Sequence, residues 1–171
     1  MKKLIIFLSL IICFDHAFVI AQTKDDEKSP FDLTRDQRIK KERIFGVYIP
    51  KDLEDAFKEL DKKIEDPSKE LLKSKTEDEV SNKLHYNFGR WMIINWSFYE
   101  GSRLTVYLNK LGIYHPDDMA DFVLRTYYRY LTQKPTKYDD LIEKYKENTK
   151  KKLEEKQKKA IIISTQTKKQ E

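Results

Sequence analysis

The segment from Glu77 to Trp96 restricts the folds open to this chain more than any other part of the sequence. In a helix that turns about 100° per residue, one face of this segment collects six apolar side chains. These are Val80, Leu84, Phe88, Trp91, Met92 and Ile94. Ile93 and Trp96 add apolar surface to the opposite side, and a helix that is apolar all round is buried. We therefore expect a continuous central helix against which the other helices pack, with Gly89 allowing another segment to approach closely.

Flanking segments also repeat apolar residues every three to four positions, and each has ordinary helix start or stop signals. The signals include the capping box Thr76–Glu79, Ser102 before one helix, and Pro116 at the first position of another. The run Arg43–Ile49 is β-branched and short, and without a partner strand it predicts no sheet. The sequence thus predicts an all-α fold, a small helical domain around one central helix followed by a charged C-terminal helix.

The N-terminus has the order of a secretory signal. A positive start, Met1–Lys3, precedes the apolar run Leu4–Cys13, and the charged chain begins at Gln22 after the small residue Ala21. We expect cleavage between Ala21 and Gln22, with export to the periplasm or out of the cell. The alternatives are an uncleaved anchor, for which the apolar run is short beside the ~20 residues of a span, and a lipoprotein attached through Cys13.

The expected organisation follows from these shifts in composition. It comprises a signal peptide (residues 1–21), a mobile polar spacer (22–45), a helical domain (46–132) and a charged helical tail (133–171). The single cysteine lies in the signal, so the exported protein has no disulfide and depends on its core for stability.

Positive charge is concentrated in the tail. The formal net charge of the chain is +5, and residues 133–171 hold twelve lysines against seven acidic residues. The helical domain is therefore nearly balanced, which argues against a nucleic-acid partner. Lysines next to the apolar patch Ala160–Ile163 predict, at most, a weak and salt-sensitive contact with an anionic membrane surface.

Few residues are candidates for chemistry. His115, Asp117 and Asp118 have the residue types of a base with two carboxylates or of part of a metal site, but they also suit a helix N-terminus, with His115 as the cap and two acids on the helix dipole. Asn87 and Asn95 fall on the apolar stripe. They either bond the backbone of neighbouring turns or line a pocket with Arg90, Trp91 and Trp96.

Three stretches together resemble a bacterial family of domains of unknown function that is often found in short exported proteins. They are Gly46–Asp55, then Phe88–Trp91 with Asn95 and Trp96, then Gly112–Met119. The family pattern has an arginine at the position of Ile94. The resemblance covers roughly Gly46 to Leu131 and implies the helical domain without implying a mechanism.

The sequence contains no phosphate loop, dinucleotide fingerprint or nucleophile elbow, and we expect neither a cofactor nor a metal. The leading expectation is a non-enzymatic exported interaction module of the bacterial envelope, with an unknown protein or envelope partner. The alternative is a small-ligand binder or enzyme with a site near Arg90, Asn95, His115, Asp117 and Asp118. Convergence of these five side chains in one pocket would favour the alternative, and dispersal would favour the module.

Overall fold

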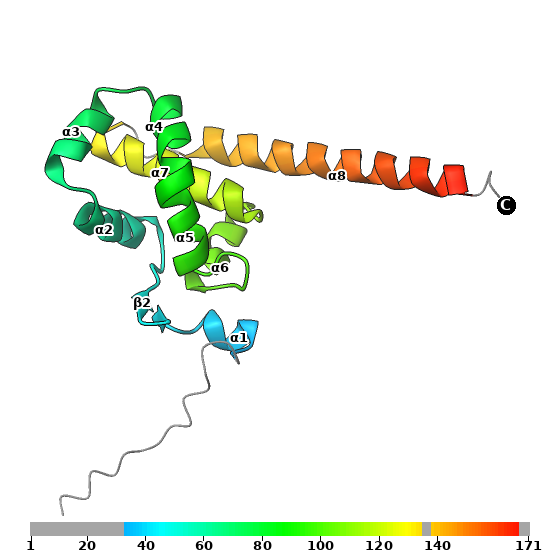
Figure 1. Cartoon of the computed structure of the whole chain (residues 1–171), viewed down its shortest axis with the longest axis horizontal. Helices are drawn as coiled ribbons and strands as arrows, with labels where there is room; N and C mark the ends of the chain where they lie inside the picture. The colour runs from blue at the N-terminus through cyan, green and yellow to red at the C-terminus, as the bar shows by residue number, and fades with distance from the viewer. Residues whose placement is uncertain (1–32, 135–137, 168–171) are drawn as a thin grey trace, which may run out of the picture.

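The computed structural model describes residues 33–134 and 138–167, and it confirms the all-α prediction apart from one small hairpin (Figure 1). The expected signal peptide and its Ala21–Gln22 cleavage position lie outside the described residues. The elements are α1 (Arg35–Arg38), β1 (Arg43–Ile44), β2 (Val47–Tyr48), α2 (Leu53–Lys63), α3 (Asp66–Lys73), α4 (Glu77–Leu84), the π-helix η2 (His85–Gly89), α5 (Arg90–Asn95), α6 (Arg103–Lys110), α7 (Pro116–Leu131) and α8 (Asp139–Thr167). In this described part, no helix combines the length and the apolar character needed to cross a membrane.

The hairpin corrects the expectation that this run would have no partner strand. β1 pairs antiparallel with β2, with Ile44 opposite Val47. The connecting residues Phe45 and Gly46 both have positive φ angles, 51° and 76°, as the tight turns that suit a twisted hairpin require. Ile44 and Ile49 are buried, so the hairpin packs on the helical body. Two described elements, α1 and β1, lie inside residues 22–45, where we expected a mobile polar spacer.

The most enclosed helix is α7, and this corrects the expectation that Glu77–Trp96 would be central. An unbroken run of seven residues in α7, Phe122–Tyr128, is buried. The helix contacts α2, α3, α4, η2 and α5. Two residues of this buried run, Arg125 and Thr126, are polar, so the sequence does not reveal how fully the helix is enclosed.

The expected continuous helix is divided by the π-helix η2. A π turn holds one extra residue, so the helix that follows is rotated by about 100° relative to an uninterrupted α-helix. Met92, Ile93 and Trp96 consequently face the core, whereas Ile94 is 64% exposed. A Cβ atom added to Gly89 would lie 3.3 Å from Nδ1 of His85, so Gly89 makes room for a side chain of its own helix and not for another segment.

The C-terminal helix α8 lies on the body only through its first turns. Leu141 and Tyr145 are buried, while every described side chain from Lys150 to Ile161 is exposed. The ribbon extends away from the body over this second half (Figure 1). Within the charged helical tail that we expected over residues 133–171, α8 runs from Asp139 through the apolar patch to Thr167.

Candidate binding surface beside the π-helix

Large side chains gather at the surface around η2 and the segment that follows α5. Tyr86, Ile94 and Tyr99 are 82%, 64% and 68% exposed. They line a pocket of about 400 Å³ together with His85, Arg90, Ile93 and Asp117. We call these seven residues the π surface. The exposure of Ile94 follows from the π turn, because the rotation that brings Ile93 inward turns Ile94 outward.

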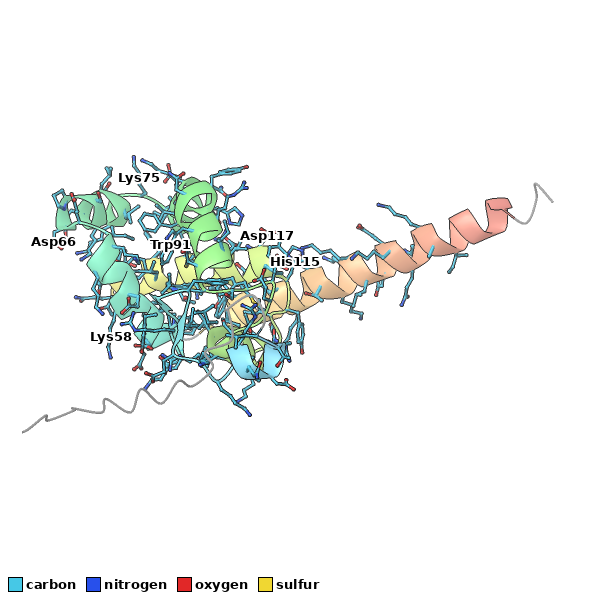
Figure 2. All side chains as sticks on the ribbon, turned by 60° about the horizontal axis from the view of Figure 1, so that its bottom comes forward. Lys58, Asp66, Lys75, Trp91, His115 and Asp117 are labelled. Carbon is cyan, nitrogen blue, oxygen red and sulfur yellow. The ribbon has the colours of Figure 1, made fainter. Side chains whose placement is uncertain are left out.

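Asp117 lies between two histidines at the edge of this pocket. Its carboxylate is 3.4 Å from Nδ1 of His115 and 4.0 Å from Nε2 of His85. The backbone N–H of Asp117 donates to His115 Nδ1 at 3.3 Å, which confirms His115 as the N-cap of α7. Figure 2 shows His115 and Asp117 together at the start of this helix. Among the residues that the structure describes, no three histidine, cysteine or acidic side chains are grouped as a metal site requires.

The remaining predicted site residues do not join this pocket. Asp118 points to α8, where its carboxylate is 3.4 Å from the ammonium group of Lys152. Trp96 is fully buried and packs edge-to-face on Trp91, with ring centroids 5.5 Å apart. Trp91 and Asn95 line a different groove, so the five residues of the alternative site are dispersed.

The groove that holds Trp91 and Asn95 has a volume of about 770 Å³ and runs between α2 and the hairpin. Lys63 of α2 places its ammonium group 4.4 Å from the Trp91 ring centre. Trp91 is half-buried and lies apart from His115 and Asp117, on the side of α2 (Figure 2). The Asn95 amide donates to the Trp91 carbonyl at 2.9 Å, so it bonds its own helix and not the turns that we expected. Asn87 is exposed.

Tyr48 and Asp55 also line this groove. The Tyr48 hydroxyl donates to Asp55 at 2.8 Å, and this bond raises the pKa of Tyr48. Burial raises the pKa of Asp55, but hydrogen bonds from Tyr48 and the Lys51 backbone outweigh burial and hold that pKa below its ordinary value. The Tyr48 hydroxyl and the Asp55 carboxylate are therefore hydrogen-bonded to each other. The Arg103 guanidinium lies over the Tyr48 ring, 4.9 Å from its centre.

Sequence reasoning missed a polar network between α4, α7 and α8. The Asp121 carboxylate accepts hydrogen bonds from Ser81 and Tyr145 and pairs with Arg125 at 3.0 Å. Burial raises the pKa of Asp121, and the three donors outweigh it and lower that pKa. One turn after Arg125 on α7, the Arg129 guanidinium forms ion pairs with Glu77 at 2.9 Å and with Asp140 at 2.6 Å. In the sequence, only the i,i+4 spacing of Asp121 and Arg125 on α7 indicates any part of this network.

Comparison with known proteins places most of these features in one family domain. Residues 49–131 match the family model of a domain of unknown function, DUF6794. The matched stretch runs from just before α2 to the end of α7, so it includes the π surface but excludes β1, β2 and α8. It agrees with the resemblance to an uncharacterised family that the sequence motifs suggest. No curated protein and no solved structure matches the chain.

Proposed function

We propose that this protein is a non-enzymatic interaction module, exported to the bacterial envelope, that binds a partner protein through the π surface. The observation that carries the proposal is the exposure of Tyr86, Ile94 and Tyr99 around one pocket. Tyrosine and arginine are enriched among the residues that dominate protein interfaces, and Arg90 lies on the same surface. The dispersal of the predicted chemical residues supports a binding role over a catalytic one.

Site-specific photo-crosslinking in cells tests this proposal. A photoreactive phenylalanine analogue replaces Tyr86 or Tyr99 in the full chain, and the matched control replaces the exposed Leu71 of α3. We expect a discrete adduct from the first two positions and none from Leu71. Equal adducts from all three positions, or none from any, would contradict a binding surface at η2.

Export is a separate part of the proposal and has its own test. The order of charges and apolar residues before Gln22 supports a cleaved signal. Cell fractionation followed by N-terminal sequencing should find Gln22 as the first residue of protein outside the cytoplasm. An intact N-terminus in the cytoplasmic fraction would contradict it.

A small-ligand binder is the second candidate, because Arg90 and Asp117 from the predicted set do line one pocket. A volume of about 400 Å³ lies within the ordinary range for ligand sites. Arg90→Ala would then abolish binding of a small molecule while leaving the crosslink from Tyr86 in place. Under the leading proposal, Arg90→Ala weakens the crosslink itself.

We also propose weak contact of the tail with anionic membranes. In the described residues the lysines of α8 are exposed from Lys150 onward, and Lys156, Lys158 and Lys159 lie beyond the last contact with the body. Co-sedimentation with anionic vesicles at low salt should fall when the chain ends at Leu153, which retains the Lys152–Asp118 pair. Unchanged co-sedimentation of the shortened protein would contradict a membrane contact through the end of α8.

A further inference from the structure

A second pocket, separate from the π surface, lies over the start of α2. It has a volume of about 640 Å³ and shares no residue with the pocket beside η2. Aromatic side chains line it, and they come from four different segments of the chain. They are Phe57 of α2, Tyr107 of α6, Tyr130 of α7, and Tyr138 just before α8. We call this cavity the aromatic pocket.

The fold holds these rings in place. Phe57 is almost fully buried and stacks on Tyr130 with ring centroids 5.0 Å apart. The Tyr130 hydroxyl bonds Asp61 at 3.2 Å, and the Tyr138 ring packs edge-to-face on the buried Phe122. Tyr130 remains 45% exposed, so part of its surface is open to the pocket. A preformed aromatic wall of this kind requires little ordering when a ligand binds.

The wall of the aromatic pocket also carries acidic side chains. Asp52 and Glu54 line the pocket at the start of α2, and Lys58 is the basic residue that lines it. Both carboxylates lie close enough to the phenol of Tyr107 to act on it: burial raises the pKa of this phenol most, and Asp52 and Glu54 raise it further. Burial likewise raises the pKa of Tyr138, with further contributions from Tyr107 and Glu54.

We propose that the aromatic pocket binds an organic cation through its ammonium group. Aromatic faces carry negative charge that attracts alkylammonium and quaternary ammonium groups, and carboxylates at the same site add to that attraction. An anion would meet Asp52 and Glu54 unfavourably, and a neutral apolar molecule would gain from the rings alone. Two carboxylates against the single ammonium group of Lys58 leave the pocket wall net negative, and together with the four aromatic rings this favours a positively charged ligand.

The first test compares two molecules of the same shape. Choline and its neutral carbon isostere 3,3-dimethylbutan-1-ol are titrated separately into the full chain purified after expression, and the tyrosine ring signals are followed by NMR. We expect choline to shift the signals of Tyr107 and Tyr138 and to bind at least about tenfold more tightly than the isostere. Equal affinity of the two molecules would overturn the proposal. Butylammonium as a third probe tells a primary from a quaternary head group.

The second test uses charge variants, which separates recognition from folding. Lys58→Gln removes the positive charge from the pocket wall and should tighten choline binding roughly two- to threefold. A gain of affinity cannot come from a misfolded protein. Glu54→Gln should weaken binding, and Glu143→Gln on the exposed side of α8 is the matched control that should not. The proposal fails if Lys58→Gln does not tighten binding or if both glutamate variants behave alike. These outcomes are independent of the crosslinking at the π surface.

Discussion

The phenolic hydroxyl of Tyr145 on α8 donates a hydrogen bond to the carboxylate of Asp121 on α7. Tyr145 is buried, and burial together with this bond raises its pKa well above the ordinary value for a tyrosine. The bond links a helix outside the matched family domain to the most enclosed helix inside it. The docking of α8 therefore depends on a polar contact as well as on the packing of Leu141.

Tyr145→Phe removes this donor and keeps the ring. We expect the free energy of unfolding to fall by about 1–2 kcal/mol, because Asp121 loses one of its partners in a partly buried position. Urea denaturation followed by circular dichroism measures the change. Tyr99→Phe, at an exposed ring, is the matched control and should have no measurable effect. An unchanged midpoint for Tyr145→Phe would show that the Tyr145–Asp121 hydrogen bond does not contribute to the docking of α8.

Acid should destabilise the protein through Asp121. Its pKa is lower in the folded protein than the value of about 3.9 expected in the unfolded chain, so the unfolded state binds more protons in this range. The stabilisation is fully present above pH ~4 and is lost as the pH falls through the folded value. Urea midpoints measured between pH 7 and pH 2 should show this loss.

Asp121→Asn is the variant that assigns this acid dependence. It should lower the stability at pH 7 by about 3 kcal/mol, because Arg125 is left mostly buried with one fewer acidic partner. The variant should also show a shallower decline below pH 4. A decline as steep as in the parent protein would assign the effect to other carboxylates, such as Asp55.

The two tryptophans should differ sharply in their contributions to stability. Trp96 is fully buried, so Trp96→Ala should cost about 3–5 kcal/mol. Trp91 is half-buried at the groove, and Trp91→Ala should cost less than half as much. Chemical denaturation of both variants under one condition provides the comparison. Equal costs would contradict the placement of Trp91 at the surface.

Gly89 tests the π-helix directly. Replacing a helical glycine by alanine usually stabilises by about 1 kcal/mol, but here the new Cβ would crowd the His85 ring at 3.3 Å. Gly89→Ala alone should therefore give no gain. Gly89→Ala combined with His85→Ala should recover the gain relative to His85→Ala alone, and a double-mutant cycle measures the coupling. Additive effects would show that the two residues do not constrain each other.

Local signals in the sequence were enough to predict the helices and several of their ends. The capping box at Thr76 is present, with the Thr76 backbone N–H donating to Glu79 at 2.8 Å. Ser102 caps α6 and His115 caps α7, as their neighbours in sequence suggest. Such caps depend on residues three positions apart or fewer, and for that reason a single sequence reveals them.

The site could not be predicted in the same way. The extra residue in the π turn at η2 rotates the side chains of α5 about the helix axis. A regular spacing of apolar residues therefore does not predict that Ile94 faces solvent and Ile93 faces the core. Asp121 and Ser81 are forty residues apart in sequence, so their contact follows from how α4 crosses α7. His85 lines the pocket that also holds Arg90 and Asp117, and no local motif in the sequence links His85 to Asp117.

The unattached half of α8 gives the protein a spacer. A helix rises 1.5 Å per residue, so the stretch from Leu153 to Thr167 places its tip about 20 Å beyond the last contact with the body at Lys152. Any partner held at that tip is kept clear of the π surface and of the aromatic pocket. The two ends of the molecule can therefore be occupied at the same time without steric competition.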